Sequence, residues 1–135
     1  MKWFCLYTGV NAESIAKNGL IAKGFETYLP MQTRVVKHAR QQKLKSIPLL
    51  SRYLFVKFDI EGEWSYPIRS TDGVETILSN NQIPMQIPEW IIQEFKSREA
   101  AGEFHKSLPK NTKSGWNRSF EALKQILDGS RQVAV

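Results

Sequence analysis

The chain has 135 residues, of which 41% are hydrophobic and 24% are charged. This length and composition allow one folded domain with an appendage, and they argue against a disordered chain or two full-sized domains. Nineteen Lys and Arg residues outweigh 13 Asp and Glu residues, and the resulting charge of +6 favours a polyanionic partner such as nucleic acid.

The cysteine, the histidines and the N-terminal run exclude several classes of protein. Cys5 is the only cysteine, so an intrachain disulfide is impossible, and a zinc site would have only Cys5, His38 and His105 to draw on. The apolar N-terminal run turns polar at Thr8, which is too short for a signal peptide or a membrane span. We therefore expect a cytoplasmic protein that is neither exported nor inserted in a membrane, with no metal or other cofactor.

The first 30 residues predict a strand, a helix and a second strand. Residues 2–8 have bulky side chains on both faces, which is typical of a central strand covered on both sides. Asn11 is expected to cap a helix over Ala12–Lys23 that ends at Gly24. Phe25–Leu29 is short and aromatic and predicts the second strand.

The next segment, Met31–Ile47, predicts a long hairpin or an extended loop that projects from the body. It lies within an interval, Thr27–Phe58, that contains seven Lys and Arg residues and no acid. This interval is therefore a concentrated positive field. Its last part, Arg52–Phe58, has the strongest strand signal in the chain and predicts a core strand.

The remaining elements complete one mixed domain. Glu63–Arg69 predicts a helix of one or two turns, and Val74–Leu78 predicts a further strand. A final helix should begin at Pro88 and end before Gly102. The order β, α, β, β, α, β and then a helix predicts an α+β domain over residues 1–102, with an antiparallel sheet flanked by helices.

Four segments occur in a recognisable order: Trp3–Tyr7, Gly24–Pro30, Pro48–Val56 and Ile68–Val74. Together they resemble the N-terminal (NGN) domain of the NusG/RfaH family, and the pair PLLSRYLFV and IRSTDGV is the most specific part. The likeness implies an NGN-type βαββαβ sandwich and a transcription elongation and antitermination factor. The sequence-reading branch of the family has basic residues where this chain has Gly9, Val10 and Asn11, so the likeness does not extend to a particular DNA element.

The resemblance implies three binding surfaces. The clamp helices of the largest RNA polymerase subunit should bind an apolar depression that maps to Tyr7, Leu50, Tyr53, Phe55, Ile92 and Phe95. The other large subunit, across the DNA channel, should contact Trp64, Ser65 and Tyr66. The non-template DNA strand should lie near Arg69, with a wider basic field of Lys17, Lys23, Arg34, Lys37 and Arg40.

Alternatives remain for each surface and for the function. The six apolar residues also fit an ordinary core, the aromatics of the second surface can fold inward, and the basic residues can be a solvated face. No phosphate-binding glycine loop, metal-ligand spacing or nucleophile elbow is visible, so we expect a monomer that acts mechanically and is not an enzyme. The alternative functions are a stand-alone module that binds single-stranded nucleic acid without polymerase, and a domain that caps another protein.

Residues 103–135 read as a linker and a short tail. The family normally has a KOW β-barrel here, and this segment is too short for a complete one. Phe120, Leu123, Ile126 and Leu127 fit either the middle of such a barrel, with Gln132–Val135 as a strand, or one face of a helix that stops at Gly129. We favour the helix and expect it to dock on the apolar depression, where it would compete with the clamp helices. The tail would then provide no coupling to Rho or to the ribosome.

Overall fold

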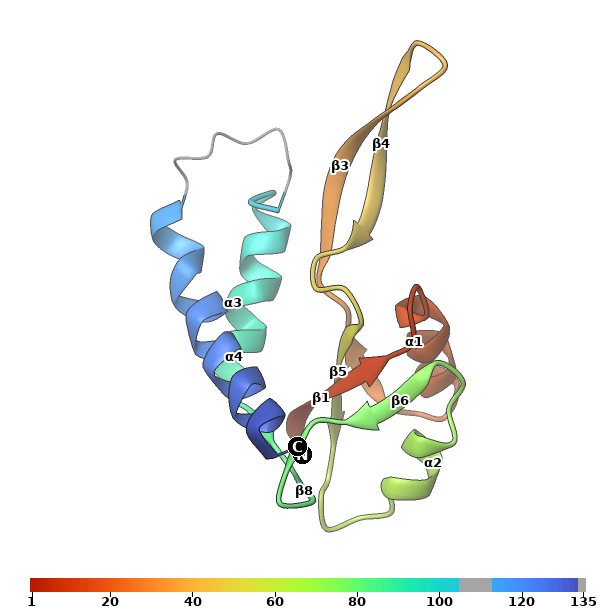
Figure 1. Cartoon of the computed structure of the whole chain (residues 1–135), viewed down its shortest axis with the longest axis vertical. Coiled ribbons are helices and arrows are strands. Elements are labelled where there is room, and N and C mark those ends of the chain that lie inside the picture. Colours follow the sequence, from red (N-terminus) through yellow and green to blue (C-terminus); the bar gives the residue numbers. More distant parts are fainter. Residues whose placement is uncertain (105–112, 134–135) are drawn as a thin grey trace.

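Five antiparallel strands form the central sheet of the computed structural model, which describes residues 1–104 and 113–133 (Figure 1). The strand order is β2-β5-β1-β6, and β9 also pairs with β1. The bounds of these strands are β1 Lys2–Thr8, β2 Glu26–Tyr28, β5 Tyr53–Phe58, β6 Val74–Ile77 and β9 Gln86–Ile87. This architecture confirms the predicted α+β class with an antiparallel sheet.

Helices cover both faces of the sheet. Helices α1 (Glu13–Ala22) and α2 (Ser65–Arg69) pack on one face, and α3 (Glu89–Ala100) and α4 (Lys113–Val133) lie together at the other face (Figure 1). Each face therefore has its own hydrophobic core.

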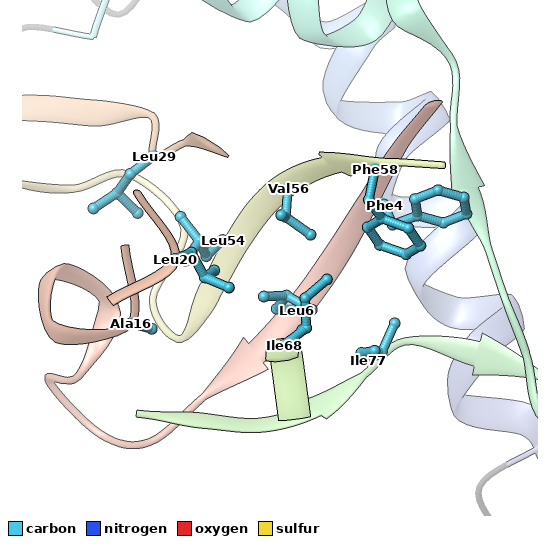
Figure 2. Packing of buried hydrophobic residues seen from close by; sticks show 10 residues of the cluster. All are labelled: Phe4, Leu6, Ala16, Leu20, Leu29, Leu54, Val56, Phe58, Ile68 and Ile77. Carbon is cyan, nitrogen blue, oxygen red and sulfur yellow. The ribbon is translucent and has the colours of Figure 1, made fainter. Parts of the chain in front are cut away.

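Strand β1 supplies side chains to both cores in alternation. Phe4 and Leu6 join the core that includes Leu20 of α1 and Ile68 of α2 (Figure 2). Trp3 and Cys5 join the core beneath α3 and α4. The sequence predicted this double coverage, because bulky residues at consecutive positions of a strand must be buried on opposite faces.

A second sheet consists of β3 (Met31–His38) and β4 (Gln41–Pro48), which project from the body as a long ribbon (Figure 1). The turn residues Ala39 and Arg40 both have positive φ, 50° and 69°, as a two-residue type I′ hairpin turn requires. The base of the ribbon is held by Glu99, whose carboxylate accepts hydrogen bonds from the Tyr28 hydroxyl at 2.8 Å and from the Met31 N–H at 3.2 Å. The sequence left a long hairpin and an extended loop open for this projecting segment, and the structure shows the hairpin.

Several predicted boundaries are wrong. Asn11 does not cap α1: its φ of 59° is left-handed, and the helix begins two residues later without a side-chain cap. Pro88 precedes α3 as its N-cap residue rather than being its first residue. Gly129 does not end the C-terminal helix, because α4 continues to Val133.

The sequence did not reveal a small hairpin of β7 (Ser79–Asn80) and β8 (Ile83–Pro84), nor the two-residue strand β9. Strands of two residues have no measurable period, so no pattern could have indicated them. Gly24, with φ of +91°, and Gly102, with φ of +78°, follow their helices in the left-handed conformation that the sequence predicted for helix ends.

Candidate functional site

The six residues assigned to the apolar depression come together on the α3 side of the sheet. Tyr7 and Tyr53 are directly opposite each other on β1 and β5, and their ring centroids are 5.5 Å apart. Both tyrosines are half-buried, as is Leu50. Phe55, Ile92 and Phe95, in contrast, are fully buried. The structure thus divides the set into two parts. We call the partly exposed residues Tyr7, Leu50 and Tyr53 the rim, and the buried residues Phe55, Ile92 and Phe95 the floor.

Helix α4 lies over this floor. Leu123 is 1% exposed within the same core, and Phe120, Ala122, Ile126 and Leu127 pack against it. The Phe95 and Phe120 ring centroids are 4.8 Å apart. A further contact near the helix is the Arg118 guanidinium, which lies 5.4 Å from the centroid of the Trp90 ring on α3. Residues 113–133 of the tail are therefore helical, and α4 is docked on the surface of α3. The last two residues of the alternative strand Gln132–Val135 lie outside the described residues.

Arg52 organises the rim, a role that the sequence did not indicate. Its guanidinium lies 4.3 Å from the centroid of the Tyr7 ring, and it donates hydrogen bonds to the Thr8 carbonyl at 2.9 Å and to the Glu75 carboxylate at 3.0 Å. The Arg52 backbone N–H donates to the buried Glu13 carboxylate at 2.9 Å. Arg52 also has a φ of 71°, so these contacts hold it in a conformation that a non-glycine residue seldom adopts.

The second predicted surface contains one inward and two outward residues. Trp64 stacks on Phe58 with ring centroids 4.9 Å apart, and its indole N–H donates to the Ile60 carbonyl at 2.9 Å. Ser65 is exposed, and Tyr66 is 81% exposed. These three residues line a surface depression with a volume of about 420 Å³.

The predicted basic residues form two separate groups. Arg34, Lys37 and Arg40 are exposed on the ribbon. Lys17 lies on α1, Lys23 is the residue that follows α1, and Arg69 lies on α2. Arg69 is exposed, and its Nε donates to the Ser65 hydroxyl at 3.1 Å. Lys17 is half-buried.

Lys23 has a structural role in addition to its charge. Its ammonium donates to the Pro67 carbonyl at 2.8 Å, to the Ser70 hydroxyl at 3.2 Å and to the Thr71 hydroxyl at 2.9 Å. These bonds tie the end of α1 to the end of α2. A phosphate group at this position would have to share the ammonium with three protein oxygens.

Burial raises the pKa of two titratable side chains, Cys5 and Tyr28. Burial raises the pKa of the Cys5 thiol, which keeps it protonated and unreactive. Burial, followed by the hydrogen bond to Glu99, raises the pKa of Tyr28. Over residues 1–104 and 113–133, no three His, Cys, Asp or Glu side chains gather as metal ligands would, and none of the helices there is long and apolar enough to cross a membrane. His105 lies outside these residues.

The sheet with helices on both faces, the aromatic rim and the basic surfaces define a mixed α+β domain. The family model described as transcription termination factor NusG matches residues 1–96, which is most of the chain. The chain therefore belongs to the NusG family of transcription factors, and its role is in transcription. Comparison with curated proteins gives no significant match.

Proposed function

We propose that this chain is an elongation and antitermination factor that binds the clamp helices of the largest RNA polymerase subunit. The observation that carries the proposal is the half-buried Tyr7–Tyr53 pair, which borders an apolar floor of Phe55, Ile92 and Phe95. Tyrosine combines a large apolar ring with a polar tip, which suits a surface that alternates between solvent and a protein partner. Leu50 completes this rim, and Arg52 fixes the Tyr7 ring.

Helix α4 is then an intramolecular competitor of the clamp helices. It presents an apolar face to α3 and covers the floor through Leu123 and Phe120. Two helical partners cannot occupy the same surface at once. The docked state accordingly binds polymerase weakly, and the affinity of the whole chain depends on how often α4 leaves.

The second surface bridges to the opposite large subunit across the DNA channel. Tyr66 provides the exposed aromatic contact, and Ser65 stands beside it. Trp64 packs inward on Phe58 and therefore positions these neighbours. A factor that holds both walls of the channel disfavours clamp opening, and so it suppresses pausing and termination without any chemical step.

The third surface attracts the non-template DNA strand. Arg69 lies on α2 beside Ser65. Lys17 on α1 and Lys23 at the end of α1 extend the positive surface, with Arg34, Lys37 and Arg40 on the ribbon. Phosphate attraction of this kind is independent of sequence and weakens with salt. We propose that the factor acts as a monomer in the cytoplasm, with residues 1–102 as the polymerase-binding domain.

The alternative of a stand-alone single-strand-binding module has less support. Such modules stack bases on aromatic side chains of an open sheet face. In the part of the chain that the structure describes, Trp3, Phe4, Phe55 and Phe58 are each at most 2% exposed, because helices cover both faces of the sheet. These sheet aromatics offer no stacking surface.

The proposal is tested by binding of a clamp-helix fragment to purified protein. Tyr7→Ala and Tyr53→Ala should each weaken binding by on the order of 1–2 kcal/mol, since rim tyrosines are typical interface hot spots. Tyr66→Ala is the matched control: it removes the same side chain from the other surface and should leave clamp-helix affinity unchanged. Undiminished binding by a folded Tyr7→Ala/Tyr53→Ala double variant would overturn the assignment.

A further inference from the structure

Two of the three rim residues belong to one β-turn. Leu50 and Tyr53 are its first and fourth residues, and the hydrogen bond from the Tyr53 N–H to the Leu50 carbonyl closes it at 3.3 Å. Arg52 is the third residue, and its φ of 71° is the left-handed value that a type II turn requires at this position. Glycine adopts that conformation readily, whereas arginine seldom does. A contact from outside the turn must therefore hold Arg52 in place.

Arg52 also connects the turn to the third rim residue. Its guanidinium lies 4.3 Å from the centroid of the Tyr7 ring. Its Nε donates to the Thr8 carbonyl at 2.9 Å, and the Thr8 N–H donates to the Arg52 carbonyl at 2.8 Å. These contacts fix the strand that carries Tyr7 relative to the turn that carries Leu50 and Tyr53. The conformation of Arg52 therefore decides how the three rim side chains lie together.

Glu13, in the first turn of α1, is the outside group that holds the Arg52 backbone. Its carboxylate accepts a hydrogen bond from the Arg52 N–H at 2.9 Å, and the residue is 5% exposed. Among the residues that the structure describes, the Glu13 side chain makes no other hydrogen bond and no ion pair. Burying a carboxylate costs free energy that hydrogen bonding must offset, so this single bond to a main-chain donor indicates a specific role.

We propose that Glu13 is a positioning residue for the clamp-helix surface. By accepting the Arg52 N–H, it keeps the turn from Leu50 to Tyr53 in the form that brings the three rim side chains together before the partner arrives. A surface that is arranged in advance binds its partner without the cost of ordering it. This inference rests on the proposed function for the identity of the partner, the clamp helices. It assigns a role in binding to a buried residue that lies outside the rim and the floor.

The place of Glu13 in α1 suggests a purely structural alternative. Negative charge in the first turn of a helix is stabilised by the helix dipole. That role needs the charge of the side chain, whereas the positioning role needs only an oxygen that accepts a hydrogen bond. Glu13→Gln keeps the oxygen and loses the charge, and Glu13→Ala loses both. The two substitutions therefore separate the two roles.

The experiment compares these variants of the full chain by clamp-helix affinity and by amide hydrogen exchange. A labelled clamp-helix fragment is titrated at a temperature at which circular dichroism shows every variant to be folded. Exchange at the Arg52 N–H reports on the bond to Glu13 without any polymerase component. Ile68→Val is the stability control, because it trims a fully buried residue of the core that α1 covers and leaves the turn unchanged.

We expect Glu13→Ala to speed exchange at the Arg52 N–H and to weaken clamp-helix binding by on the order of tenfold, since a hydrogen bond to a charged group shifts a local equilibrium by about that factor. Glu13→Gln and Ile68→Val should keep the wild-type affinity. In the Tyr7→Ala/Tyr53→Ala background, Glu13→Ala should cause no further loss, because Glu13 acts through the rim.

Three results would overturn the inference: unchanged exchange at Arg52 in Glu13→Ala, unchanged affinity of that variant, or an equal loss of affinity in Glu13→Gln, which the dipole role predicts. If Tyr7→Ala/Tyr53→Ala weakens binding and Glu13→Ala does not, the proposed function stands and only the positioning role fails. If the tyrosine double variant binds as tightly as the wild type, the proposed function fails and the inference fails with it.

Discussion

Replacing Leu123 with alanine should release α4 and raise the affinity of the whole chain for the clamp helices. Leu123 is 1% exposed and lies in the core that also contains Phe95. Replacing a buried leucine with alanine lowers the free energy of the packing that it stabilises by about 2–5 kcal/mol. At the lower end of this range the docking equilibrium shifts roughly 30-fold toward the released state, since each 1.4 kcal/mol is a factor of about ten.

In the proposed function the clamp helices bind only the released state, so their apparent affinity should rise by a factor that cannot exceed this shift. The assay is titration of a labelled clamp-helix fragment with full-length protein. Lys124→Ala, a change at the exposed neighbouring position of the same helix, should leave the affinity unchanged. Amide hydrogen exchange of α4 reports directly whether the helix has been released.

A chain that ends at Lys110 lacks α4 altogether and should bind at least as tightly as Leu123→Ala. If the full chain and this shorter chain bind the clamp helices equally, α4 does not compete, and the reasoning from its docked position is refuted. The same conclusion follows if hydrogen exchange in Leu123→Ala shows a released α4 without any gain in affinity.

Three further predictions concern stability. Phe95→Ala should destabilise the protein by about 3–5 kcal/mol in denaturant titration, because the ring is fully buried; a loss under 1 kcal/mol would contradict its place in the core. Gly73→Ala should lower Tm, since its φ is +91° and an added Cβ would lie 3.0 Å from the Ala12 carbonyl oxygen; an unchanged Tm would contradict this backbone geometry. Burial and Glu99 raise the pKa of Tyr28, so the folded state favours the neutral phenol, and stability should fall as pH rises above about 10. The Tyr28→Phe variant should lose less stability over that pH range than the wild-type protein, and equal losses would contradict a raised pKa of Tyr28.

The sequence was sufficient to predict an element wherever its local pattern is compatible with only one kind of structure. Consecutive bulky residues in 2–8 require a strand buried on both faces, and β1 is that strand. The polar, acid-free composition of Met31–Ile47 predicted a segment that projects from the body, and the structure shows that this segment is a hairpin rather than an extended loop. Gly24 ends α1 because glycine adopts positive φ at little cost.

Only the tertiary structure decided which apolar residues are floor and which are rim. Tyr53 and Phe55 lie on the same strand and the same face, yet the first is half-buried and the second is fully buried. The difference depends on α3 and α4, whose docking no local pattern encodes. Burial is a property of the neighbours that long-range packing brings to a side chain, and periodicity reports only the direction in which the side chain points.

Arg52 illustrates the same limit for polar groups. Its sequence neighbours predict an ordinary strand residue, but it adopts a φ of 71° and joins Thr8, Glu13 and Glu75. These partners are 23 to 44 residues away in the chain. The sequence by itself therefore determined the longer helices and strands and the charge of the ribbon. The shape of the rim and the position of α4 were determined by contacts between distant segments, whose energies exceed the local preferences they override.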